Sequence, residues 1–251
     1  MVRLFEVFGD AVVDPIPKAI RVGDLIHGSR IDGRDPRSGL YPATSKEQLV
    51  NAYATLRAAV ESAGASTSNI AQVSFFLKNF DDRALLNDEW VEMFPDVADR
   101  PTYKFMPAPL IGEQLVQLEF FAVPGSTRRD IHVQGVAHTN PIPMAVQIGA
   151  YLFSSRLLAY DPATQSAAEG ADAQADFLIQ HAQTILDEAG FSWRDVVQGR
   201  GFVANASLMP LLSRRWDARF PDAAERPPLH FVEYGSGSLQ VMLEFIAKRA
   251  E

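Results

Sequence analysis

The feature that most constrains the fold of this chain is an internal repeat with a spacing of 126 residues. Arg30 and Arg156 lie at this spacing, and each follows Ser and precedes Asp-Pro by the same distance. Repeats of solenoid proteins are roughly 20 to 50 residues long, so each copy is interpreted as a domain. The other matched segments are Asp14–Ile20 with Asn140–Val146, Gly23 with Gly149, Ala63-Gly64 with Ala189-Gly190, Asn79 with Asn205, Trp90 with Trp216, Phe94-Pro95 with Phe220-Pro221, and Arg100-Pro101 with Arg226-Pro227.

The repeat divides the 251 residues into an N-terminal domain, residues 1–124, and a more divergent C-terminal domain, residues 125–251. The boundary is placed in segment 124–130, which begins with Pro, Gly and Ser. Between Glu119 and Glu244 the spacing shortens to 125. This places one deletion in the loop before the last strand, where deletions are tolerated.

Apolar residues at helical spacing predict one long helix in each copy. Both helices are expected to end at Ala-Gly, because Gly is favoured at a helix C-terminus. Strands are predicted around residues 20–31, 71–80 and 113–123, with counterparts in the second half, and a second helix carries Trp90 or Trp216. Each half is therefore predicted as β-β-α-β-α-β, an α+β fold with a mixed sheet and two helices on one face. The apolar stripes are Leu49, Ala52, Tyr53, Leu56, Ala59, Val60 and Ala63 in one copy, and Ala175, Leu178, Ile179, Ala182, Ile185, Leu186 and Ala189 in the other.

Composition excludes several classes of function. A formal net charge of −8 argues against a nucleic-acid partner, because such proteins usually carry a basic surface. The chain has no cysteine, so disulfides, thiolate metal sites and thiol nucleophiles are excluded. The five histidines show no metal-ligand spacing, and no metal or other cofactor is expected. No signal peptide and no apolar run of membrane-spanning length is found, which predicts a cytoplasmic protein without membrane contact.

Several short motifs resemble the Rid family, the reactive intermediate deaminases also called the YjgF family. They are AIRVGDLIHGSRI followed by DP, LRAAVESAGAS, VSFFLKNFDD, NDEWVEMFP, and RPTYKF followed by LVQLEFFAV, in that family's order along residues 11–123. The second half repeats the order more weakly. The resemblance implies a homotrimer with ligand clefts between neighbouring subunits. It also implies cofactor-free hydrolysis of enamines and imines to ketoacids and ammonia.

The sequence departs from the family at three positions that carry this chemistry. The family's Arg two residues after Pro is replaced by Tyr103 and Leu229. Its Glu in the last strand is replaced by Gln117 and Met242, while Glu119 and Glu244 match a neighbouring structural glutamate. Its N-terminal Tyr is replaced by Ile16 and Ile142. Either the function differs, or the charged groups occupy other positions.

The repeated arginines are the main candidates for substrate binding. Arg30 and Arg156 end the strand that lines the cleft in the family, where a guanidinium group could bind the substrate carboxylate. The alternative is a structural ion pair, with Asp35 or Asp161 or with Glu119 or Glu244, and such pairs contribute little when exposed. Both interpretations remain open.

The candidate catalytic residues are Tyr103, Lys104 and His230, because a hydroxyl, an amine or an imidazole can act as acid or base. Because side chains alternate along a strand, one residue of the pair Tyr103 and Lys104, and one of the pair Leu229 and His230, would point away from the site. Asn79 and Asn205 are candidates for hydrogen bonds to a ligand, although Asn also forms turns. GRGFVA and YGSGSL loosely resemble nucleotide-binding motifs, but they are interpreted as part of a strand and as a hairpin turn.

Three functions are compatible with these residues. The first is a hydrolase or deaminase of a small carboxylated enamine or imine, such as a 2-aminomuconate-type or 2-aminoacrylate-type acid. The second is a non-catalytic ligand-binding or assembly protein that has lost the usual catalytic residues. The third is a lyase or hydrolase acting on a cyclic carboxylic acid. If the trimer of the family needs three domains per ring, three two-domain chains supply six domains, which predicts a homotrimer.

Overall fold

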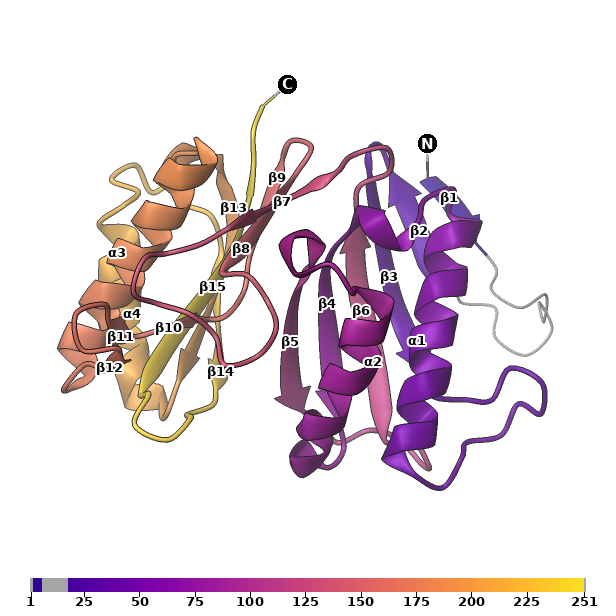
Figure 1. The fold of residues 1–251 in the computed structure, drawn as a ribbon. Coiled ribbons are helices and arrows are strands. Elements are labelled where there is room, and N and C mark those ends of the chain that lie inside the picture. Colours follow the sequence, from indigo (N-terminus) through magenta and orange to yellow (C-terminus); the bar gives the residue numbers. More distant parts are fainter. Residues whose placement is uncertain (1, 6–17, 251) are drawn as a thin grey trace. The chain divides into compact units, whose positions relative to one another are not determined.

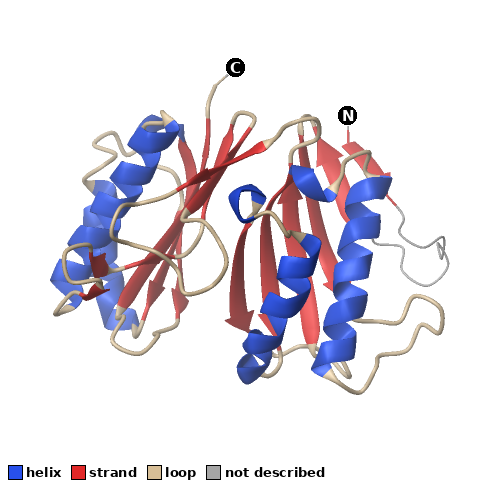
Figure 2. Cartoon of the chain, viewed as in Figure 1, coloured by secondary structure: helices blue, strands red, loops and turns tan. Residues whose placement is uncertain are grey.

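The computed structural model describes residues 2–5 and 18–250 of the chain. The described residues form two compact units, one made of residues 2–5, 18–129 and 140–142 and the other of residues 130–139 and 143–250. Figure 1 shows the elements of each unit, and Figure 2 shows that the helices of each unit cover one face of its sheet. The predicted α+β architecture, a mixed sheet with two helices on one face in each half, is what the structure contains.

The N-terminal unit has one six-stranded sheet in the order β1-β2-β3-β6-β4-β5. Neighbouring strands are antiparallel except β4 and β5, which are parallel. Its elements are β1 (Val2–Phe5), β2 (Ala19–Val22), β3 (Leu25–Asp32), α1 (Ser45–Ser62), β4 (Ile70–Leu77), α2 (Leu86–Met93), β5 (Thr102–Pro107) and β6 (Val116–Ala122), with short 3-10 turns η1 (Thr67–Asn69), η2 (Phe80–Leu85) and η3 (Val97–Asp99).

The C-terminal unit repeats this topology in the order β7-β8-β9-β15-β13-β14, in which β7 takes the place of β1, and β10 also pairs with β15. Strands β13 and β14 are parallel, like their N-terminal counterparts. Its elements are β7 (Arg128–Ile131), β8 (Ala145–Ile148), β9 (Tyr151–Ser154), β10 (Leu157–Leu158), β11 (Tyr160–Asp161), β12 (Ser166–Ala167), α3 (Ala171–Ala189), β13 (Val196–Val203), α4 (Met209–Asp217), β14 (Leu229–Glu233) and β15 (Val241–Lys248), with 3-10 turns η4 (Trp193–Asp195) and η5 (Ala206–Leu208).

Strands β5 and β14 were missing from the predicted order, as were β1 and β7 at the start of each unit and the short strands β10, β11 and β12. Strands β5 and β14 follow α2 and α4 and pair with β4 and β13, so each unit has two strands after its second helix where one was predicted. Each comes directly after proline, Pro101 or Pro227-Pro228, which in a sequence indicates a loop. Both strands lie at an edge of the sheet, where a preceding proline costs no hydrogen bond of a central ladder.

The predicted long helices are confirmed. The predicted stripe of α1 is buried, as is that of α3, so each helix packs one apolar face on its sheet. Helix α1 is capped by Thr44, whose hydroxyl accepts a hydrogen bond from the N–H of Glu47. Helix α3 ends at Gly190, whose φ of 68° is readily adopted only by glycine. Trp90 and Trp216 are fully buried at matched positions, as predicted for core residues.

The glycines of GRGFVA lie within β13, as expected. A Cβ atom on Gly199 would come within 2.5 Å of the Trp216 ring, and one on Gly201 within 2.7 Å of the Phe231 ring. Both glycines therefore face packed side chains, and Arg200 between them points to the other face of the sheet. The motif reflects close packing in a strand, and no phosphate-binding turn is present in it.

No helix in the described part of the chain combines the length and the apolar character needed to cross a membrane.

Arg30 has an unusual backbone conformation that leads to a stability prediction. Its φ is 56°, in the left-handed region, at the point where the pairing of β3 with β6 shifts between Gly28 and Ile31. A non-glycine residue in this conformation costs about 1–2 kcal/mol. Glycine avoids this cost, but its larger conformational entropy in the unfolded state offsets part of the gain. We expect Arg30→Gly to raise the free energy of unfolding by about 0.5–1 kcal/mol in urea titrations. Arg156→Gly is the control. Because Arg156 does not have a positive φ, this variant should be less stable than the wild-type protein.

Candidate functional site

The sheet face opposite the helices carries a row of polar side chains in each unit. In the C-terminal unit, Arg200 of β13 is paired in register with His230 of β14 on one side and with Glu244 of β15 on the other. Arg156 precedes β10, whose first residue, Leu157, is paired with Leu243. These four residues, His230, Arg200, Glu244 and Arg156, are called the C-terminal polar row.

The C-terminal polar row is held together by charged hydrogen bonds. Arg200 Nη1 lies 2.8 Å from Glu244 Oε1, and Arg200 Nε donates to His230 Nε2 at 2.5 Å. His230 is exposed, Arg200 is half-buried, and Glu244 is only 4% exposed. Because His230 Nε2 accepts this hydrogen bond, the proton of the neutral imidazole is on Nδ1.

Arg156 lies against two aromatic rings beside this row. Its guanidinium carbon is 4.0 Å from the centroid of the Phe202 ring and 5.1 Å from that of Tyr234. Burial lowers the pKa of Arg156, while the carboxylate of Glu244 raises it and the positive charge of Arg200 lowers it. The group remains a cation, because an arginine does not lose its proton in proteins. Arg156, Arg200 and Glu244 are thus close enough to interact electrostatically.

His138, which is half-buried, contacts the residue before Arg156. Its Nε2 lies 2.5 Å from Ser155 Oγ, and that hydroxyl donates to the Met144 carbonyl at 2.9 Å. Burial, with a smaller contribution from the charge of Arg156, lowers the pKa of His138 to about 4, so the ring is neutral at pH 7. A histidine activates a serine by accepting the hydroxyl proton, but the Ser155 hydroxyl donates its proton to the Met144 carbonyl. His138 and Ser155 are therefore not arranged as a base and a nucleophile.

The N-terminal unit has a corresponding but different row. Ser74 of β4 is paired with Lys104 of β5 and with Glu119 of β6, and the shift in the β3–β6 pairing leaves Arg30 opposite Glu119. We call Lys104, Ser74, Glu119 and Arg30 the N-terminal polar row. Ser74 thus takes the place of Arg200, and Lys104 that of His230. Lys104 is buried, whereas Arg30 is exposed.

The two residues of each candidate pair, Tyr103 with Lys104 and Leu229 with His230, lie on opposite faces of their strand. Tyr103 is 2% exposed, packs edge-on against Trp90, and donates to Asn87 Oδ1 at 2.6 Å on the helix side. Burial raises its pKa well above the usual value. Leu229 likewise lies beside Gly199 and Trp216. Lys104 and His230 therefore share a face with Glu119 and Glu244, and Tyr103 does not.

The other predicted residues form local structure. Asn79 and Asn205 are exposed and cap short turns, because their side-chain oxygens accept from the N–H groups of Asp81 and Ser207. Asp35 Oδ1 accepts from two N–H groups of its own turn, which lowers its pKa. Asp161 Oδ1 accepts from the N–H of Ala163 in the same way, so the repeated Asp-Pro closes a turn in each unit. Ile16 lies outside the described residues.

Sequence reasoning missed Arg200 and Tyr234 and treated Glu244 as structural. Arg200 and Glu244 are recognisable as a pair only once the register of β13 and β15 is known. The available signal was the charged residue between two glycines in an otherwise apolar strand. No group of three or more His, Cys, Asp or Glu side chains suited to a metal ion occurs among residues 2–5 and 18–250.

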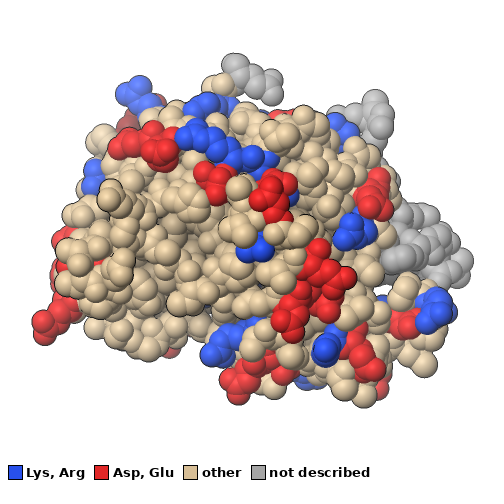
Figure 3. All heavy atoms as spheres, in the orientation of Figure 1, with Lys and Arg blue, Asp and Glu red and all other residues tan. Residues whose placement is uncertain are grey.

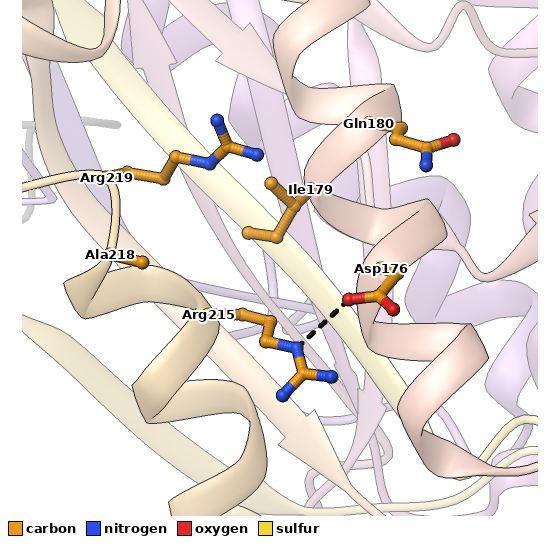
Figure 4. Close-up of a pocket in the computed structure, with 6 residues that line it drawn as sticks. All are labelled: Asp176, Ile179, Gln180, Arg215, Ala218 and Arg219. Atoms are coloured by element: carbon orange, nitrogen blue, oxygen red, sulfur yellow. Dashed lines mark hydrogen bonds and ion pairs between the residues drawn. The ribbon is translucent and has the colours of Figure 1, made fainter.

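A hollow of about 370 Å³ lies between α3 and α4 of the C-terminal unit. Figure 4 shows Arg215 and Arg219 extending towards α3, with Arg215 bonded to Asp176. Arg215 also pairs with Asp172 at 3.0 Å, so both aspartates are bound to Arg215, while the Arg219 guanidinium carbon lies 5.7 Å from the centroid of the Trp193 ring.

Charged side chains of both signs are interspersed on the face shown in Figure 3, and acidic groups gather over α2. Asp88, Glu89 and Glu92 belong to this helix, and burial together with the charge of Glu92 raises the pKa of Glu89. The face shown carries no continuous basic surface.

The sequence profile of the endoribonuclease L-PSP family matches residues 11–123. These residues lie in the N-terminal unit, which belongs to this family, also called Rid. The C-terminal unit repeats the sheet order of the N-terminal one, which is consistent with a tandem arrangement of two Rid-like domains. Curated relatives match only part of its length.

A 2-iminobutanoate/2-iminopropanoate deaminase from Dermatophagoides farinae is 28% identical over 83 residues, 33% of this chain. A RutC family protein from Pyrococcus abyssi is 31% identical over the same length. The chain spans 65% of the length of each of these two relatives. A RutC family protein from Aquifex aeolicus is 28% identical over 114 residues, 44% of this chain and 90% of the relative.

Solved Rid structures match about half of the chain. RidA from an Antarctic Psychrobacter species is 24% identical, with a TM-score of 0.45, over 48% of this chain and 99% of its own. A Rid family protein from Yersinia pestis is 18% identical, with a TM-score of 0.46, over 49% and 99%.

Proposed function

We propose that this Rid protein is a cytoplasmic, cofactor-free hydrolase that releases ammonia from a small carboxylated imine or enamine, and that the C-terminal polar row is its active site. The observation that carries the proposal is the convergence of Arg156 and the Arg200–Glu244 pair beside His230. The C-terminal polar row holds two guanidinium groups and one carboxylate, and guanidinium groups bind a carboxylate through charged, often bidentate hydrogen bonds.

The roles follow from the hydrogen-bonding capacity of each group. Hydrolysis of a protonated imine requires water to add to the carbon of the C=N bond, with loss of one water proton to a base. In the proposal, Arg156 binds the substrate carboxylate and Glu244 accepts the proton of the attacking water. Arg200 donates to both Glu244 and His230 and so keeps the carboxylate of Glu244 directed along the row.

The substrate class is supported by the Rid membership and by the name of the Dermatophagoides farinae relative. RNA cleavage, which the family description suggests, is not proposed, because a net charge of −8 is unfavourable for binding a polyanion. The C-terminal row is preferred over the N-terminal row because Ser74 there cannot replace the second guanidinium group. Tyr103, Asn79 and Asn205 take no part in the proposed mechanism.

The test is a coupled assay of ammonia release with freshly generated 2-aminoacrylate and 2-aminomuconate. We expect saturable turnover above the spontaneous rate with at least one of them. Glu244→Gln should abolish most of it, whereas Glu188→Gln, at an exposed position on α3, should not. If neither substrate is turned over by the wild-type protein, the proposal is wrong.

A second candidate function is ligand binding without turnover. It is favoured by the residues at positions 103, 117, 229 and 242, which are Tyr, Gln, Leu and Met where the resemblance predicts Arg and Glu. This alternative predicts saturable binding of pyruvate in calorimetry and no ammonia release from any imine.

The Rid resemblance also leads to a prediction about assembly. If three domains are needed to close one ring, three chains with six domains form the smallest closed assembly. We expect light scattering to give a mass close to three times that of the 27.7 kDa chain. A stable monomer at micromolar concentration would contradict this prediction.

A further inference from the structure

Tyr234 lies beside the C-terminal polar row, directly after β14. Its N–H donates to the Val203 carbonyl at 2.8 Å, which fixes the backbone at this position. Its ring meets the buried Phe202 ring edge-on, with centroids 6.4 Å apart. The half-buried side chain is therefore held against the same aromatic surface as Arg156.

The Arg156 guanidinium carbon lies 5.1 Å from the centroid of the Tyr234 ring, and a hydrogen bond between the two side chains raises the pKa of Arg156. A guanidinium group can only donate, so the phenolic oxygen accepts and its own proton is directed away from Arg156. If Arg156 binds the substrate carboxylate, this O–H belongs to a side chain that contacts the substrate-binding residue. Neither Arg156 nor Arg200 can supply a proton, because arginine does not deprotonate in proteins.

We infer that Tyr234 is the general acid of the reaction, and this inference rests on the proposed function. After water has added to the protonated imine, the substrate carbon carries one hydroxyl and one amino group. Tyr234 transfers its proton to the nitrogen, the C–N bond breaks, and its electron pair leaves with ammonia. The carbinol hydroxyl becomes the carbonyl, and its proton restores the phenol. The proton taken up by Glu244 passes to solvent, so the step needs no other reactant.

The assignment also distinguishes the two units. The N-terminal position that matches Tyr234 is Ala108, so the N-terminal row has no phenol at this place. The predicted hairpin turn in YGSGSL is present, since Ser236 and Leu239 form an antiparallel bridge around Gly237, whose φ is 59°. Tyr234 precedes this turn and is not one of its turn residues.

The test is Tyr234→Phe, which keeps the ring beside Arg156 and removes only the hydroxyl. We expect kcat for ammonia release to fall about 100-fold, the lower end of typical acid–base contributions, with KM within about threefold of wild type. Tyr234→His, which restores a proton donor, should recover part of kcat. Tyr160→Phe is the matched control, because Tyr160 is also half-buried in this unit but contacts His181 through its backbone carbonyl.

The possible failures are distinguishable. An unchanged kcat in Tyr234→Phe, with normal wild-type turnover, overturns this inference alone. So does a tenfold rise in KM at unchanged kcat, which would mean that the hydroxyl only positions Arg156. Absence of wild-type turnover overturns the proposed function and the inference together. Urea denaturation of each variant establishes that it is folded.

Discussion

Arg156→Met is expected to lower kcat/KM for ammonia release about 100-fold and to raise the dissociation constant of pyruvate at least tenfold. A hydrogen bond to a charged group contributes about 1.5–3 kcal/mol, and each 1.4 kcal/mol corresponds to a factor of ten. Glu244 pairs with Arg200, and the loss of Arg156 removes the guanidinium group proposed to bind the carboxylate. Enzyme kinetics and calorimetry measure the two quantities.

Arg30→Met is the matched control, because it changes the same position of the repeat. Arg30 is exposed and belongs to the N-terminal row, which lacks a counterpart of Arg200. Its replacement should leave both constants within about twofold. Arg156→Lys keeps a positive charge without the planar fork and should have an intermediate effect. Equal losses in Arg30→Met and Arg156→Met, or no loss in either, would contradict the assignment of the active row.

Gln174→Ala is expected to lower the free energy of unfolding by about 3 kcal/mol, as several buried backbone groups lose their partner. Gln174 is 1% exposed on α3, and its amide nitrogen donates to the carbonyls of Ala168 and Ser238, both at 2.9 Å. Its oxygen accepts from the N–H of Gln240 at 2.7 Å. One side chain thus joins two loops to the helix.

Gln48 makes the corresponding contacts in the N-terminal unit, where it binds the carbonyls of Pro42 and Glu113 and the N–H of Leu115. Gln48→Ala should therefore show a similar loss. Gln180→Ala, at an exposed position of α3, is the control and should change stability by less than about 0.5 kcal/mol. Urea titrations followed by circular dichroism measure all three. A loss below 1 kcal/mol in Gln174→Ala would show that water replaces the lost contacts.

Gln48 and Gln174 show what a repeat can reveal without a structure. They are identical at the repeat spacing and lie beside the apolar stripes, so a role shared by both domains could have been inferred from the sequence. The groups that they bind could not have been inferred from the sequence, because two of the three contacts of Gln48 are to residues more than 60 positions away in the chain. Local spacing identifies such a residue, and only the fold identifies what it holds.

The candidate site illustrates the same limit. Arg156 and His230 were recognisable as candidates because each occupies a position where the repeat meets a Rid motif. Tyr103 was an equally good candidate on the same grounds, and the pleat of β5 directs it into the core against Trp90. Arg200 gave a weaker signal, since it stands between glycines that face Trp216 and Phe231.

The sequence by itself determined the two-domain organisation, the helix faces, the helix ends and the Rid architecture, since these depend on periodicity and on residues close together in the chain. The tertiary structure decided which side chains form the polar rows. His230, Arg200, Glu244 and Arg156 lie on separate strands or next to one, and they meet because strand order and register bring them into one line. Register depends on the packing of the whole sheet, and a shift of one residue would turn each side chain to the opposite face.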